Sequence, residues 1–211
     1  MNRRDDGRAR RLGWLAGVVV VLAGCAALRG GPSDAEVAQV MKSSFSERGI
    51  AKLDRLDQTP LQQACSEYAQ GELPKALREK LEKQALDAVK YPADSRYLGD
   101  WREGERIAQS GRGLQFSDAP GAVAGGNCYA CHQLSKAELA FGNIGPSLYQ
   151  YGKLRGNGEA ILEYTWAKVS NPHAFNACSS MPRFGEAGIL TEQQLKHVMA
   201  LLLDPASPVN R

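Results

Sequence analysis

The pentapeptide Cys-Tyr-Ala-Cys-His constrains this chain more than any other part of its sequence. It lies in "GGNCYACHQL", residues 125 to 134, and brings Cys128, Cys131 and His132 into one short stretch of backbone. This spacing is typical of covalent c-type haem attachment. Both cysteines form thioether bonds to the vinyl groups of the haem, because the two-residue spacer presents both sulfurs along one porphyrin edge. His132 is then placed under the iron as an axial ligand.

Two other uses of a cysteine pair fit the sequence less well. A structural zinc site needs two further ligands, and the chain contains no second Cys-x-x-Cys and no closely spaced histidine pair. A thioredoxin-type redox pair is expected in a βαβ setting, and no segment of strand length alternates between apolar and polar residues. We therefore expect one covalent haem c, with zinc binding and dithiol chemistry as the alternatives.

The N-terminus has the composition of an export signal. A basic segment precedes the apolar run 12–24, which is shorter than the roughly 20 residues that a membrane-spanning helix needs. The run ends in "LAGC", which resembles a bacterial lipoprotein box with Cys25 as the lipidated residue. Ordinary cleavage near this point and an uncleaved anchor are the alternatives. We predict a signal peptide over 1–24, a tether over 25–33, and a periplasmic protein held to a membrane by lipid, in a compartment where disulfides persist.

The charge of the remaining chain is balanced. The whole sequence has 26 basic and 23 acidic side chains, and residues 1–24 contain five arginines and two aspartates, so the remainder carries 21 of each. Binding to nucleic acid depends on lysine and arginine side chains that neutralise phosphates. We therefore expect no nucleic-acid partner.

Capping residues and breakers predict helices throughout the chain. Ser33 and Glu36 form a capping box before a helix that Gly49 stops, and Thr59 precedes a helix that begins at Pro60. The predicted helices cover residues 33–49, 59–71, 73–92, 99–111, 145–156, 157–172 and 191–205, with a glycine-rich loop over 111–126. We expect an all-α protein with an N-terminal helical extension over 34–95 and a cytochrome c-like domain over 96–211.

A haem iron has a second axial position, for which Met181 is the main candidate. It lies in the polar loop "NACSSMPRFG", residues 176 to 185, before the last predicted helix. The other candidates are His173, His197, Met199 and Cys178, of which Met199 also fits an apolar helix stripe and is expected in the core. Ligation by histidine and methionine raises the redox potential and closes the coordination sphere. That arrangement suits an electron carrier better than a substrate-binding site.

Two further features surround this predicted centre. Pro146, in "FGNIGPSL", either offers its carbonyl oxygen to Nδ1–H of His132 or forms a plain Gly-Pro turn, and precedent among c-type cytochromes favours the first. Cys65 and Cys178 are the two cysteines that remain, and in an oxidising compartment they are predicted to form a disulfide. This bond would link the N-terminal extension to the Met181 loop. A reactive free thiol is the alternative.

Several segments together resemble one cytochrome family. "GGNCYACHQL", "FGNIGPSLYQYGKLRG", "NACSSMPRFG" and "GILTEQQLKHVMALLLDPASPVN" resemble SoxX, the monohaem c-type cytochrome subunit of the bacterial thiosulfate-oxidising Sox system. "KYPADSRYLGDWREGERIAQSGRG" resembles the extended form of that subunit, so the likeness runs from about residue 40 to the C-terminus. The lipoprotein box departs from subunits that have a simple cleaved signal.

The resemblance implies a class I-like cytochrome c domain and a specific role. Cys128 and Cys131 would attach the haem, and His132 and Met181 would ligate its iron. The chain would be the electron-transfer subunit of a SoxAX-type L-cysteine S-thiosulfotransferase, paired with a SoxA-type dihaem or monohaem cytochrome. It would accept the electrons released when thiosulfate is joined to a cysteine of the SoxYZ carrier, and pass them to a soluble cytochrome c. No catalytic residue is expected on this chain.

Two other functions are compatible with the motif. A stand-alone, membrane-tethered monohaem cytochrome c would use the same ligands without a haem-bearing partner. A haem sensor or gas binder would need an open sixth position, which Met181 disfavours.

Overall fold

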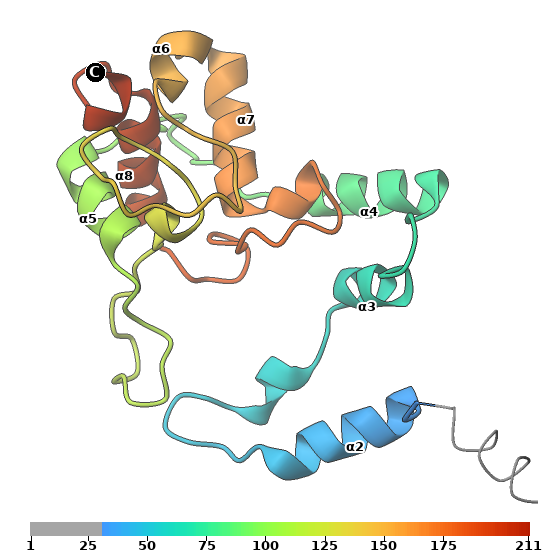
Figure 1. The fold of residues 1–211 in the computed structure, drawn as a ribbon. Helices are drawn as coiled ribbons and strands as arrows, with labels where there is room; N and C mark the ends of the chain where they lie inside the picture. The colour runs from blue at the N-terminus through green and yellow to red at the C-terminus, as the bar shows by residue number, and fades with distance from the viewer. Residues whose placement is uncertain (1–30) are drawn as a thin grey trace, which may run out of the picture. The chain divides into compact units, whose positions relative to one another are not determined.

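The computed structural model describes residues 31–211, and Figure 1 shows their path. Within this range the secondary structure is helical, with no strand and one isolated β-bridge between Arg48 and Ala51. The all-α prediction is therefore confirmed for this part of the chain. The predicted signal peptide and Cys25 lie outside the described residues. Among the helices between residues 31 and 211, none combines the length and the apolar character that a membrane span requires.

The chain divides into two compact units, Met1–Ser46 and Glu47–Arg211. The first unit contains helix α2 (Asp34–Ser44), which opens with the predicted capping box between Ser33 and Glu36. The helix ends at Ser44, earlier than the expected stop at Gly49, because Phe45 already has extended backbone. No residue of α2 is buried.

The second unit contains the remaining helices. The capping boxes at Thr59 and Thr191 confirm the predicted starts of two of them. Its elements are η1 (Leu53–Leu56), α3 (Pro60–Glu67), α4 (Lys75–Asp87), α5 (Trp101–Gln109), η2 (Cys128–Ala130), α6 (Tyr151–Arg155), α7 (Glu159–Ser170), η3 (Pro172–Ala174), α8 (Glu192–Leu203) and η4 (Pro208–Asn210). Helix α6 is shorter than predicted because residues 145–150 are used in a loop.

The core is built around α8, which packs against α5, α6 and α7 (Figure 1). Gly104 lets α5 approach α8, since a Cβ atom there would overlap the backbone carbonyl of His197 and would lie 2.9 Å from Cβ of Leu201. The side chains of Trp166, Met199 and Leu201 are almost completely buried. Met199 is thus the core residue that its helical stripe predicts.

Residues 47–95 belong to the same unit as the C-terminal part, which differs from the expected boundary near residue 95. Trp166 donates a hydrogen bond from Nε1 to the carbonyl oxygen of Lys90 at 2.8 Å. Asn171 donates from Nδ2 to the carbonyl oxygen of Ala85 at 3.4 Å. These buried contacts join α4 and the segment after it to α7 and η3, so the structural boundary falls between residues 46 and 47.

Candidate functional site

The two cysteines and the histidine of the motif lie on one tight turn. Asn127 has the left-handed backbone conformation, with φ of 45°, and the 3-10 turn η2 follows it. The backbone N–H groups of Cys131 and His132 both donate to the carbonyl oxygen of Cys128, at 3.1 and 2.9 Å. Cys128 and Cys131 are free thiols and are half-buried. The turn therefore presents two thiols and one imidazole from five consecutive residues.

Backbone hydrogen bonds join this turn to the C-terminal end of helix α5. The backbone N–H of Gly126 donates to the carbonyl oxygen of Ile107 at 2.8 Å, and the backbone N–H of Asn127 donates to the carbonyl oxygen of Ser110 at 2.9 Å. Burial raises the pKa of the Cys128 thiol to about 12. A reactive dithiol needs a cysteine of lowered pKa. The environment of Cys128 therefore argues against thioredoxin-type chemistry.

His132 is oriented by the loop that contains Pro146. Its Nδ1 lies 2.7 Å from the carbonyl oxygen of Pro146. Because a carbonyl oxygen can only accept, Nδ1 carries a proton, and in the neutral imidazole Nε2 is then the nitrogen with the lone pair. The hydrogen bond between Gly145 N–H and the carbonyl oxygen of Cys131, at 2.8 Å, holds the loop against the turn. The contact expected from the sequence between His132 and Pro146 is present.

Gly145 allows this loop to approach the imidazole. A Cβ atom at Gly145 would overlap Cε1 and Nδ1 of the His132 ring and would lie 2.6 Å from Nε2. Only a residue without a side chain can occupy that position while the ring keeps its place. Sequence reasoning missed this role, although the glycine directly before Pro146 was a visible signal.

Met181 lies on the loop between η3 and α8. Its side chain is half-buried and packs against the apolar core that Cys128 also contacts. Its backbone N–H donates to Oγ of Ser179 at 3.2 Å. The attachment turn and the methionine therefore border the same core.

The rival axial ligands have structural roles. His173 is buried, its Nε2 lies 3.2 Å from the carbonyl oxygen of Ser179, and burial lowers its pKa. His197 accepts a hydrogen bond at Nδ1 from the backbone N–H of Asp100 at 2.8 Å. Met199 is fully buried in the core. These contacts favour Met181 over the two histidines and Met199.

The structure joins Cys65 and Cys178 in a disulfide, with a Cα–Cα distance of 5.6 Å and a sequence separation of 113. This is the pairing predicted from the cysteine count, and it removes Cys178 as an iron ligand. The backbone N–H of Ala177 also donates to Oε1 of Glu82 in α4, at 3.1 Å. Helices α3 and α4 therefore both hold the loop just before Met181.

The zinc alternative requires a larger set of ligands than the turn provides. Within residues 31–211, no group of three or more histidine, cysteine, aspartate or glutamate side chains could hold a metal ion. Four such ligands are the usual set for a structural zinc site. The described part of the chain therefore does not assemble the zinc site that was the alternative to haem.

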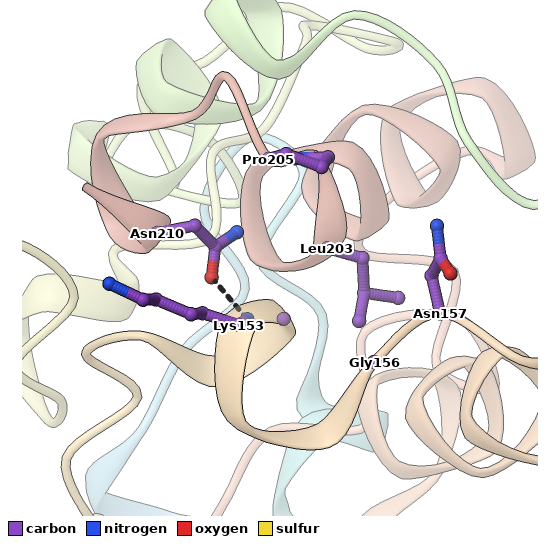
Figure 2. Close-up of a pocket in the computed structure, with 7 residues that line it drawn as sticks. Lys153, Gly156, Asn157, Leu203, Pro205 and Asn210 are labelled. Atoms are coloured by element: carbon purple, nitrogen blue, oxygen red, sulfur yellow. Dashed lines mark hydrogen bonds between the residues drawn. The ribbon is translucent and has the colours of Figure 1, made fainter.

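A surface pocket of about 300 Å³ lies elsewhere, at the C-terminal ends of α6 and α8 (Figure 2). It is lined by Gly152, Lys153, Gly156, Asn157, Leu203, Pro205 and Asn210. Asn210 accepts a hydrogen bond at Oδ1 from the backbone N–H of Lys153 at 3.1 Å, and its Nδ2 donates to the carbonyl oxygen of Asp204 at 2.9 Å. The polar groups of this side chain are thus used within the fold, and none of the motif residues lines the pocket.

Comparison with known proteins relates the chain to a lipoprotein. No family model matches the sequence. The chain is 38% identical over 130 residues to an uncharacterized lipoprotein of Aquifex aeolicus (strain VF5), and the match covers 61% of each chain. The chain therefore spans about three fifths of the length of this relative.

Proposed function

We propose that this protein is a monohaem c-type cytochrome that transfers single electrons. The observation that carries the proposal is the attachment turn, in which Cys128, Cys131 and His132 lie together and Pro146 fixes the imidazole. Among the described residues, no hydrogen bond occupies Nε2 of His132, so that nitrogen is free to ligate iron. The free thiols and the oriented imidazole are the donor set that a covalent haem uses.

A haem bound at this turn supplies one-electron redox chemistry at its iron. Cys128 and Cys131 would hold the group covalently, and His132 and Met181 would ligate its iron. The Pro146 carbonyl oxygen strengthens the His132 donor by accepting the Nδ1 proton. Cys128 and Met181 both pack against the apolar core. The chain's own residues would therefore position an electron-transfer group at the edge of that core.

Expression with a c-type cytochrome maturation system tests this proposal. The wild-type protein should retain haem on a denaturing gel, and the double variant Cys128→Ser and Cys131→Ser should lose it. The matched control is the double variant Cys65→Ser and Cys178→Ser, which removes two other cysteines and should keep the haem. Absence of covalent haem from the matured wild-type protein would show that the proposal is wrong.

The sixth ligand is tested separately. Met181→His should keep the haem but lower its midpoint potential, because a thioether ligand favours ferrous iron more than an imidazole does. Met199→Leu is the control, since that methionine is buried in the core. An unchanged potential in Met181→His would assign the sixth position to another residue.

At finer detail, we propose that the chain is the electron-accepting subunit of a SoxAX-type thiosulfate-oxidising complex. Support comes from the likeness of four sequence segments to SoxX, which correspond to the attachment turn, the Pro146 loop, the Met181 loop and α8. A pull-down should recover a second haem-bearing chain. Thiosulfate with SoxYZ should reduce this haem only when that chain is present. Equal reduction without the partner, or none with it, contradicts this assignment and favours a stand-alone carrier.

We also propose a periplasmic location with a lipid anchor at Cys25. The "LAGC" box and the lipoprotein relative support this proposal. Mass spectrometry of the mature N-terminus should find an acylated cysteine, and Cys25→Ser should move the protein from the membrane fraction to the soluble fraction. A membrane-bound Cys25→Ser protein would refute the lipid anchor.

A further inference from the structure

The carboxylate of Glu105 in α5 lies next to the attachment turn, and only one of its two oxygens has a hydrogen-bond partner among the described residues. Its Oε1 accepts hydrogen bonds from the hydroxyl group of Tyr129 at 3.0 Å and from Nε2 of Gln109 at 2.7 Å. Its Oε2 is buried, and no described residue forms a hydrogen bond with it. One carboxylate oxygen of Glu105 is therefore enclosed in the protein without a hydrogen-bond donor from the described residues.

Tyr129 places this carboxylate next to the haem-attaching residues. It lies between Cys128 and Cys131 in the sequence, and its side chain is buried, with the hydroxyl group also 3.4 Å from Oγ of Ser135. Besides burial, the negative charge of Glu105 raises the pKa of both Cys128 and Tyr129. The electrostatic field of the Glu105 carboxylate therefore acts on Sγ of Cys128, the atom that would attach the haem.

The charge of Glu105 is also uncompensated within its own helix. Arg106, the basic residue in the last turn of α5, pairs with Glu103 on the exposed side of the helix. None of the ion pairs between described residues includes Glu105. Salt screens buried charges much less than exposed ones. Glu105 is half-buried and its Oε2 is enclosed, so its charge acts on the attachment turn with reduced screening on that side.

We propose that Glu105 lowers the midpoint potential of the haem by stabilising its oxidised, more positive state. The inference rests on the proposed function, since it needs a haem at Cys128 and Cys131. A fixed negative charge attracts the ferric centre more strongly than the ferrous centre, which carries one positive charge fewer. Glu105 thus works against Met181, whose thioether raises the potential. The chain sets its potential with two groups on different elements.

The alternative role for Glu105 is purely structural, through its hydrogen bond to Tyr129. Glu105→Gln separates the two roles, because glutamine keeps the acceptor oxygen and removes the charge. Glu105→Asp keeps the charge on a shorter side chain. The matched control is Glu103→Gln on the same helix, which removes an equal charge from an exposed ion pair.

The test is redox titration of the matured protein and its three variants. Glu105→Gln should favour the reduced state by on the order of tenfold, which corresponds to about 59 mV for one electron. Glu105→Asp and Glu103→Gln should stay close to the wild-type potential. The shift in Glu105→Gln should be reduced only in part when ionic strength rises from about 0.1 M to about 1 M, because Glu105 is half-buried and its Oε2 is enclosed. The absorption of the Met–iron bond should be unchanged in all four proteins.

Three results would overturn the inference. These are an unchanged potential in Glu105→Gln, an equal shift in Glu105→Asp, and a shift that appears only together with loss of the Met–iron absorption. The first result, obtained in a protein that carries covalent haem, leaves the proposed function standing and removes only the role of Glu105. Absence of covalent haem from the wild-type protein overturns both.

Discussion

Removal of the Cys65–Cys178 disulfide should lower the free energy of unfolding by about 5 kcal/mol. The bond closes a loop with a sequence separation of 113. In the chain-entropy relation, a cross-link of this span removes about 16 cal/mol/K from the unfolded ensemble, or roughly 4.8 kcal/mol at 25 °C. Domains of this size are stable by about 5–15 kcal/mol. The double variant Cys65→Ser and Cys178→Ser should therefore lose a large share of its stability.

The same change should act locally on the loop that contains Met181. Without the disulfide, the loop keeps the bond from Ala177 to Glu82 and the contact between His173 and Ser179. Each such hydrogen bond contributes about 1 kcal/mol. The loop should then open more often, and the midpoint potential should fall as the thioether leaves the iron.

Denaturant unfolding measures the first effect and redox titration the second. Cys178 is exposed, so a reductant should reach the bond and reproduce the double variant in the wild-type protein. The double variant itself should not respond to reductant. Ser180→Ala, in the same loop, is the control for substitution alone. A loss of stability below about 1 kcal/mol together with an unchanged potential would refute the proposed stapling.

The buried His173 and the close approach of Gly145 give two further predictions. Burial lowers the pKa of His173, so on acidification the unfolded chain binds a proton before the folded protein does, and stability falls as the pH drops through about 6.5. His173→Gln should remove this part of the pH dependence of unfolding. Gly145→Ala should displace the His132 ring, cost about 1–3 kcal/mol and reduce covalent haem content, whereas Gly71→Ala should not, because a Cβ atom there meets no other atom within 4 Å.

Each of these two predictions has a clear contrary result. A pH dependence of unfolding that is identical in His173→Gln and in the wild-type protein would assign the acid sensitivity to other groups. Wild-type stability and haem content in Gly145→Ala would show that the Pro146 loop shifts to accept a side chain.

Local signals in the sequence predicted several helix starts. The capping box of Ser33 and Glu36 and the Thr59-Pro60 pair located the starts of α2 and α3, because both signals lie within a few consecutive residues. The grouping of residues 47–95 with the C-terminal part in one compact unit was not visible in local patterns. The contacts that join the two parts end on backbone carbonyl oxygens of Ala85 and Lys90, which every residue type provides.

The role of Glu105 also depends on contacts that sequence patterns do not report. Its neighbour Gly104 is buried and faces α8, whereas Glu105 itself reaches the attachment turn through Tyr129, 24 residues later. The sequence pattern of a charged helix predicts that such a glutamate is exposed to solvent. Only the packing of α5 against η2 shows that one of its carboxylate oxygens is buried.

The two cysteine pairs have a consequence for the biogenesis of the protein. Cys128 and Cys131 are three residues apart and meet readily in an unfolded chain, whereas Cys65 and Cys178 are separated by 113 residues and meet far less often. An oxidant that acts on the nascent chain would therefore join the local pair first. For the proposed haem attachment, maturation would then need a kinetic order, in which the local thiols are kept reduced until they react and the distant pair oxidises only after α3 and α4 have docked.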